Sequence, residues 1–110
     1  MSKLVCPKTL KGEALAEWKR IVPRLKSMEY ISKEDQKSLE AYCIAYAKWK
    51  EAEMKITEEG MTMTTPNGYI QQTPYVNIAL QNLRILLSIG REFGMTPASR
   101  ARINGTAFLL

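Results

Sequence analysis

Histidine is absent from this 110-residue sequence, and cysteine occurs only twice, at Cys6 and Cys43. The commonest general base is therefore missing, and neither a disulfide framework nor a Cys/His zinc site is expected. The sequence also has no glycine-rich phosphate loop, no G-x-S-x-G, no H-E-x-x-H and no paired-cysteine motif. These absences predict a protein that is not an enzyme and that uses no metal or cofactor.

Long apolar runs are lacking as well. None approaches the ~20 residues that a membrane span needs, and residues 1–7 contain no apolar signal core, so we expect neither a membrane anchor nor a secretory signal. What is present is the 45% hydrophobic and 25% charged composition of an ordinary globular protein. The length fits a single domain over residues 1–110, with loose tails predicted at 1–10 and 104–110.

Charge is distributed unevenly along the chain, whose net charge is +5. Residues 1–28 hold seven basic and two acidic side chains, residues 29–60 hold five basic and eight acidic ones, and residues 61–110 hold four basic and one acidic. An acidic middle thus lies between two basic ends. This pattern suggests either nucleic acid at one surface or oppositely charged faces that meet between subunits.

Helical periodicity predicts two helices in the first sixty residues. Apolar side chains recur at three- and four-residue spacing over residues 11–28, where Pro23 is expected to kink or break the helix. A second helix is predicted over residues 32–59, about 42 Å long, which is too long for a small core and therefore requires a partner. Cys43 lies on its apolar stripe, so we interpret it as a buried, inert thiol.

The second half of the chain predicts a hairpin followed by two helices. Residues 61–64 and 69–72 alternate in polarity and flank the turn signal Asn67-Gly68, which is typical of a β-hairpin. Because an isolated hairpin is marginally stable, it must pack on a helix or on a neighbour. The helix predicted over residues 74–93 is apolar on most sides, which indicates burial in an oligomer. A short basic helix is expected at residues 98–103.

Two groups of basic residues are candidates for DNA contact, because positive side chains on one helical face can neutralise phosphates. An ordinary solvated face is the alternative explanation of the first group, and salt bridges to the acidic second helix are the alternative for the second. The first group is Lys19, Arg20, Arg24 and Lys26, and the second is Arg100 and Arg102.

Large apolar side chains that one protomer cannot bury are candidates for a subunit interface. For the aromatic residues of the two first helices, packing between helices is favoured over stacking on bases. Met61 and Met63, beside Tyr69 and Ile70, would give the hairpin one apolar face. The interface candidates are Tyr46, Trp49, Met61, Met63, Tyr69, Leu83, Leu86 and Leu87.

Several segments occur in an order and at a spacing that resemble a known family. They read EWKRIVP at residues 17–23, LEAYC at 39–43, AYAKW at 45–49, NGYIQQTP at 67–74 and FGMTPASRAR at 93–102. Together they resemble the small terminase subunits of tailed bacteriophages and prophages, over about residues 14–103. The resemblance implies a ring-shaped, non-catalytic homo-oligomer that recognises the packaging site on double-stranded viral DNA. It also implies recruitment and regulation of the large terminase subunit, which carries the ATPase and the nuclease, in the cytoplasm of a bacterial host.

The residues and the resemblance together predict a mainly α fold. We expect a long helical hairpin-type bundle with an inserted β-hairpin and a short C-terminal helix, assembled into a ring. Two alternatives are a dimeric helical DNA-binding regulator that uses residues 96–103 as its recognition helix, and an adaptor that binds only protein through the hairpin and the tail at residues 108–110.

Overall fold

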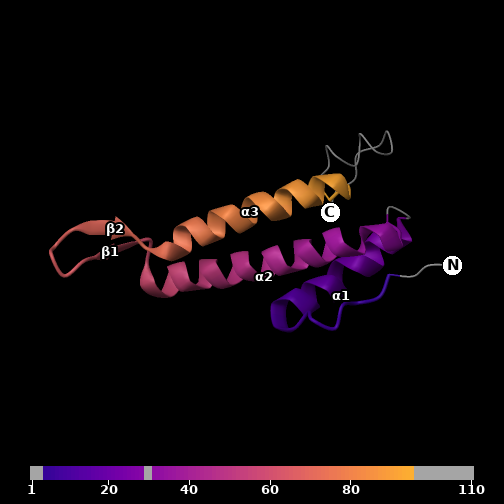
Figure 1. Cartoon of the computed structure of the whole chain (residues 1–110), viewed down its shortest axis with the longest axis horizontal. Coiled ribbons are helices and arrows are strands. Elements are labelled where there is room, and N and C mark those ends of the chain that lie inside the picture. The colour runs from indigo at the N-terminus through magenta and orange to yellow at the C-terminus, as the bar shows by residue number, and fades with distance from the viewer. Residues whose placement is uncertain (1–3, 29–30, 96–110) are drawn as a thin grey trace.

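The computed structural model describes residues 4–28 and 31–95 of the chain. Its elements follow one another along an antiparallel helical path (Figure 1). They are α1 (Gly12–Ser27), a 3-10 turn (Lys33–Asp35) that leads into α2 (Gln36–Glu59), β1 (Thr62–Thr64), β2 (Ile70–Gln72) and α3 (Pro74–Glu92). The prediction of a mainly helical fold with an inserted hairpin is confirmed. The short helix predicted at residues 98–103 and the tail at 104–110 lie outside the described residues.

Helix α1 runs without interruption from Gly12 to Ser27, with Pro23 inside it. The sequence predicts a kink or a break near Pro23, and the break is wrong because the helix is continuous. Pro23 removes only the one backbone hydrogen bond to the Lys19 carbonyl, and its ring lies on an exposed side of the helix. The opposite face of α1 buries Trp18 and Val22 in the core.

Helix α2 follows the predicted span closely, and its two ends have clear chemical causes. At the start, the Ser32 backbone N–H donates to Asp35 Oδ2 at 2.9 Å, which satisfies one of the free donors of the first turn. At the end, Gly60 adopts φ +88°, a conformation that other residues rarely adopt. The carboxyl end of α2 and the hairpin are then joined, because Thr73 Oγ1 donates to the Gly60 carbonyl at 3.0 Å.

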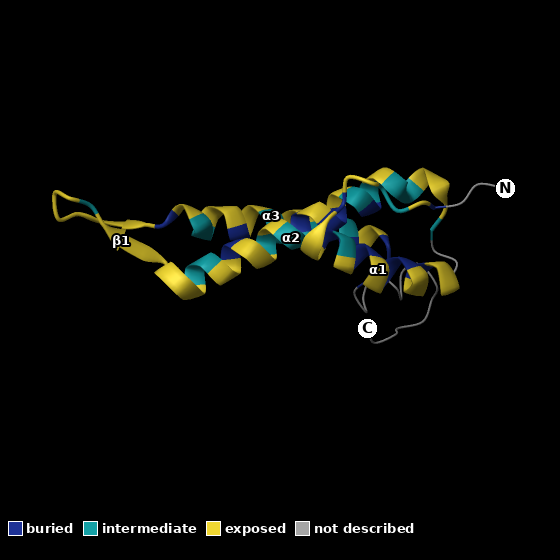
Figure 2. Ribbon diagram, turned by 90° about the horizontal axis from the view of Figure 1, so that it is seen from below, coloured by how far each residue is buried: buried dark blue, intermediate teal, exposed yellow. Residues whose placement is uncertain are grey.

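The hairpin pairs β1 and β2 antiparallel, with Met63 opposite Gln71. Gly68 closes the turn with φ +87°, and its N–H donates to the Thr65 carbonyl at 2.9 Å. Every strand residue is exposed. The hairpin therefore extends beyond the helices and does not pack on the helices of its own chain (Figures 1 and 2).

Helix α3 begins with Pro74 as its first residue, as predicted, and ends in a turn that folds the chain back. Gly94, at φ +70°, donates its N–H to the Arg91 carbonyl, and Met95 donates to the Gly90 carbonyl at 2.8 Å. This pair of bonds is the Schellman motif, in which a positive φ lets the chain reverse over the last helical turn. Met95 is thereby placed over the end of α3 and is buried.

The hydrophobic core lies at one end of an elongated molecule of 60 × 33 × 18 Å. Helix α2 packs against both α1 and α3 (Figure 1). We call the region formed by residues 4–28, the first half of α2 and the turn after α3 the core end. Its buried residues are Leu4, Leu10, Ala14, Trp18, Ile21, Val22, Leu25, Leu39, Tyr42, Cys43, Phe93 and Met95.

The segment before α1 belongs to this core end. Leu4 and Leu10 are buried, the Val5 N–H donates to Gln36 Oε1 at 3.1 Å, and Thr9 Oγ1 donates to Glu40 Oε2 at 3.0 Å. The expected loose tail at residues 1–10 is thus packed on α2 from Leu4 onward, because its two leucines reach the core.

We call residues 51–83 the distal arm, which comprises the end of α2, the hairpin and the first half of α3. Among these residues only Ala52, Thr73 and Ala79 are buried. Figure 2 shows the contrast, with dark blue concentrated around α1 and yellow dominating the arm. None of the helices in the described part of the chain is long and apolar enough to cross a membrane.

Candidate functional site

The basic residues of α1 lie at the core end and are all exposed. Arg20 and Arg24 are four residues apart and share one side of the helix, whereas Lys19 and Lys26 are seven apart and share another. The apolar face formed by Ile21, Val22 and Leu25 separates the two pairs from each other on one side. The single basic face expected from the sequence is therefore divided into an arginine edge and a lysine edge.

Arg20 is engaged in a bidentate ion pair with Glu17. Its Nε and Nη2 donate to the two carboxylate oxygens of Glu17, each at 2.8 Å. Glu17 is only 2% exposed although it is charged, and the hydrogen bond to it raises the pKa of Arg20. A buried carboxylate without a partner is costly, so one function of Arg20 is to compensate Glu17. Arg24, by contrast, forms no ion pair within residues 4–28 and 31–95.

Two side chains of α2 next to Glu17 keep their protons as a result of burial. Burial, reinforced by the Glu17 charge, raises the pKa of Cys43 to about 12. The same two causes raise the pKa of Tyr42 well above its usual range. A thiol that stays protonated is a poor nucleophile. The prediction that Cys43 is buried is confirmed, and its environment agrees with an inert role.

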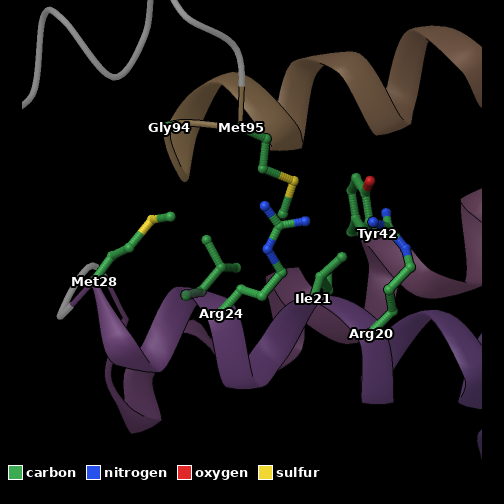
Figure 3. Close-up of a pocket in the computed structure, with 8 residues that line it drawn as sticks. Arg20, Ile21, Arg24, Met28, Tyr42, Gly94 and Met95 are labelled. Atoms are coloured by element: carbon green, nitrogen blue, oxygen red, sulfur yellow. The ribbon is translucent and has the colours of Figure 1, made fainter. Parts of the chain in front are cut away.

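A pocket of about 240 Å³ opens between α1 and the end of α3. Figure 3 shows Arg24 pointing from α1 toward Met95, with Arg20 beside Tyr42. The pocket exists because the Gly94 turn brings Met95 back over the helix end. Its floor is apolar and its rim carries the two guanidinium groups. The lining residues are Arg20, Ile21, Arg24, Leu25, Met28, Tyr42, Gly94 and Met95.

The hairpin carries an apolar face that no other residue within 4–28 and 31–95 covers. Because cross-strand partners point to the same face and side chains alternate, Met61, Met63 and Tyr69 share one face, and Ile70 points to the other. Met61 is 63% exposed and Tyr69 is 71% exposed. The three interface candidates of the hairpin are therefore brought together, with Ile70 excluded from their face.

Helix α3 is apolar on sides that do not contact α2. Leu80, Leu83 and Leu87 are spaced by three and four residues, so they form one stripe. Leu80 and Leu87 are exposed, Leu83 is half-buried, and Leu86 packs against the core. We predicted that a single chain would leave part of the apolar surface of its third helix exposed, and this agrees with the part of the chain that the structure describes.

The aromatic interface candidates of α2 lie close together where the core end meets the distal arm. The rings of Tyr46 and Trp49 are 6.0 Å apart between centroids, and Lys50 Nζ lies 5.9 Å from the Tyr46 centroid. Both aromatic side chains are half-buried. Trp49 Nε1 is buried and has no hydrogen-bond partner in the described part of the chain, although a buried indole N–H usually has one.

Two of the predicted DNA-contact residues are not described by the structure, and two features of the site were not predicted. Arg100 and Arg102 lie outside the described residues. The sequence reasoning missed Glu17 as the partner of Arg20, although their separation of three residues on one helix was a usable signal. It also missed the pocket at Met95, which depends on a chain reversal that brings distant segments together.

The chain was compared with protein families, with curated proteins and with solved structures. The model of the family described as phage terminase, small subunit, matches residues 14–107. Neither a curated protein nor a solved structure matches.

Proposed function

The chain belongs to the family of phage terminase small subunits, and on that premise we propose that it is a non-catalytic component of viral DNA packaging. It recognises packaging-site DNA as a ring of identical subunits and recruits the large terminase subunit. It acts in the cytoplasm of the host bacterium. One observation carries this proposal: the same small chain has a basic core end and a distal arm whose apolar surface is not covered by the other residues that the structure describes.

Assembly is supported by the apolar surface of the arm. Soluble monomers rarely expose large contiguous apolar patches, and such patches mark interaction sites. The hairpin face formed by Met61, Met63 and Tyr69 adjoins α3, whose Leu80 and Leu87 are also exposed. Residues 60–83 contain no charged side chain, and the centre of a stable interface is depleted of charge. Subunits packed side by side through this surface would bury it.

DNA contact is supported by the charge of the core end. Residues 4–28 carry six basic and two acidic side chains, and Lys19 and Lys26 form an exposed edge with no ion pair within the described ranges. Such an edge can displace counterions from a phosphate backbone. Arg24 and, beyond the described residues, Arg100 and Arg102 are further candidates. Arg20 is the weakest of the six, because its charge already compensates Glu17.

The test is the salt dependence of DNA binding by a Lys19→Gln, Lys26→Gln variant. If both lysines contact phosphates, affinity falls about equally for all DNA sequences, and the slope of log K against log salt becomes shallower by about 2 for each subunit that contacts the DNA. A matched control is Lys48→Gln with Lys55→Gln on α2, away from α1, which should leave the slope unchanged. An unaltered slope in the first variant contradicts the proposed DNA surface.

A further inference from the structure

We propose that the pocket between α1 and the end of α3 receives Met54 of a second copy of this chain, with Arg24 facing Glu51 and Glu58, the two carboxylates that share the face of Met54. The inference rests on the proposed assembly and adds a specific contact to it. It also gives the arginine edge of α1 a function different from the DNA contact predicted from the sequence.

The pocket suits an apolar side chain flanked by negative charge. Its floor includes Ile21, Met28 and Tyr42, which offer a methionine both dispersion contacts and a sulfur–aromatic contact. Its rim carries Arg24, whose guanidinium points toward Met95 across the opening (Figure 3). Arg24 pairs with no carboxylate among residues 4–28 and 31–95, and a guanidinium of this kind beside an apolar hollow attracts a ligand that combines a hydrophobic tip with carboxylates.

The complementary feature lies on the same chain, in the distal arm. Met54 is 56% exposed, and Glu51 and Glu58 lie three and four residues from it, on the same face of α2. Neither glutamate forms an ion pair among the residues that the structure describes. Lys50 Nζ binds Glu13 Oε2 at 2.9 Å, which places the start of α1 beside residue 50 and leaves Met54 beyond the reach of that helix.

Pocket and methionine cannot meet within one chain. Tyr42 lines the pocket and Met54 lies twelve residues farther along the same helix, which corresponds to about 18 Å. The contact is therefore between two chains, and it joins different surfaces of the two. Contacts of this kind produce rings when the rotation closes. In a closed ring the pocket and Met54 must lie at the same height, so α2 has to be inclined to the ring axis.

A disulfide trap tests the proximity directly. In full-length protein with Cys6→Ser, the pair Met28→Cys and Met54→Cys should give a ladder of covalent multimers under mild chemical oxidation, visible on non-reducing gels. The control pair, Met28→Cys with Met63→Cys, keeps the pocket cysteine and moves the second one to the hairpin, and it should stay uncrosslinked. If the assembled Met28/Met54 variant forms no ladder, or if the control crosslinks equally well, the proposed contact is wrong.

A charge swap tests the chemistry of the contact. Arg24→Glu should weaken subunit association at least about tenfold, because like charges then face each other. Adding Glu51→Arg and Glu58→Arg should restore association, and Lys26→Glu, on the other edge of α1, should leave it unchanged. Circular dichroism would establish that each variant is folded. Failure of the triple variant to recover association contradicts the pairing.

The outcomes separate this inference from the proposed function. A monomeric wild-type protein would overturn the assembly, and this contact with it. An assembled wild type whose mass and dissociation are unaltered by Arg24→Glu would overturn the contact alone. If Arg24→Glu weakens DNA binding and leaves subunit association intact, the arginine edge belongs to DNA, and the inference is contradicted.

Discussion

The core end and the distal arm share helix α2, but they differ in how much of their apolar surface is buried within the chain. At the core end, α1 and the segment before it cover α2, and twelve apolar side chains form one buried cluster. In the arm, α2 and α3 have only each other, and Met54, Ile78 and Leu80 are exposed. The difference teaches that the core end folds on contacts within its own chain, whereas the arm has apolar surface that no other part of the chain described by the structure buries.

Charge reinforces this contrast. The core end is basic, while the arm carries four acidic residues and one basic residue, all of them before residue 60. From residue 60 to residue 83 the chain has no charge at all. A surface that stayed in water would gain solubility from charged side chains, so their absence indicates that this surface is covered in the functional state.

The largest expected effect on stability comes from removing a large buried side chain from the core end. Trp18→Ala removes a buried aromatic side chain and should lower the free energy of unfolding by about 3–5 kcal/mol, independently of protein concentration. Tyr69→Ala in the exposed hairpin should change stability only in a concentration-dependent way, through the assembly. Urea denaturation at several protein concentrations measures both. Equal, concentration-independent losses would remove the distinction between the two regions.

The next effect comes from placing charge on the arm. Leu80→Asp with Leu87→Asp should dissociate the assembly while leaving helical circular dichroism intact, because burial of the part of each leucine that is still exposed contributes about 1 kcal/mol and an aspartate in its place is costly to bury. A matched control shifts both changes by one position, to Gln81→Asp with Ser88→Asp, which are exposed but lie off the stripe. Sedimentation velocity reports the masses. Dissociation by the control as well would show that the stripe is not the interface.

A smaller effect is expected from Arg20, which the sequence assigned to DNA and the structure joins to Glu17. Arg20→Met should destabilise the protein by about 1–2 kcal/mol, less than for a fully buried pair, because Arg20 is half-exposed. Combining it with Glu17→Gln should recover most of the loss, since no buried charge remains unpaired. Lys37→Met on α2 serves as the control, because Lys37 is exposed and forms no ion pair among the described residues, and it should change the unfolding free energy by less than about 0.5 kcal/mol.

The smallest effect concerns the turn that forms the pocket. A Cβ added at Gly90 would meet Met95 Sδ at 3.5 Å and Tyr42 Cε1 at 3.9 Å, which are ordinary contacts. Gly90→Ala should therefore stabilise the protein by up to about 1 kcal/mol through helix propensity. Gly94→Ala, at φ +70°, should destabilise it by about 1 kcal/mol. Thermal unfolding of the two variants gives the comparison, and equal signs would contradict the described turn.

Much of the fold could be predicted because the relevant signals are local. Apolar spacing predicted α1 and α2, Asn67-Gly68 predicted the hairpin, and Thr73-Pro74 marked the start of α3. The continuity of α1 through Pro23 was not predicted, because it depends on the burial of the apolar face of α1 in the core, which offsets the one hydrogen bond that the proline removes.

The candidate site was less predictable, because it depends on contacts between distant segments. Burial of Glu17 results from the packing of α1 on α2, and the pocket results from the return of Met95 over Gly90. Neither of these two contacts can be recognised from the spacing of residues along the sequence. The division of the basic residues into two edges, in contrast, follows from their spacing of four and seven residues and was accessible from the sequence alone.

The mass of the wild-type protein under native conditions tests the central claim most directly. Native mass spectrometry at micromolar concentration, with and without double-stranded DNA, should give a single multiple of the 12.5 kDa chain that corresponds to a closed assembly. A protomer that remains monomeric at that concentration, both alone and with DNA, would contradict the claim that the distal arm is covered by further copies of this chain.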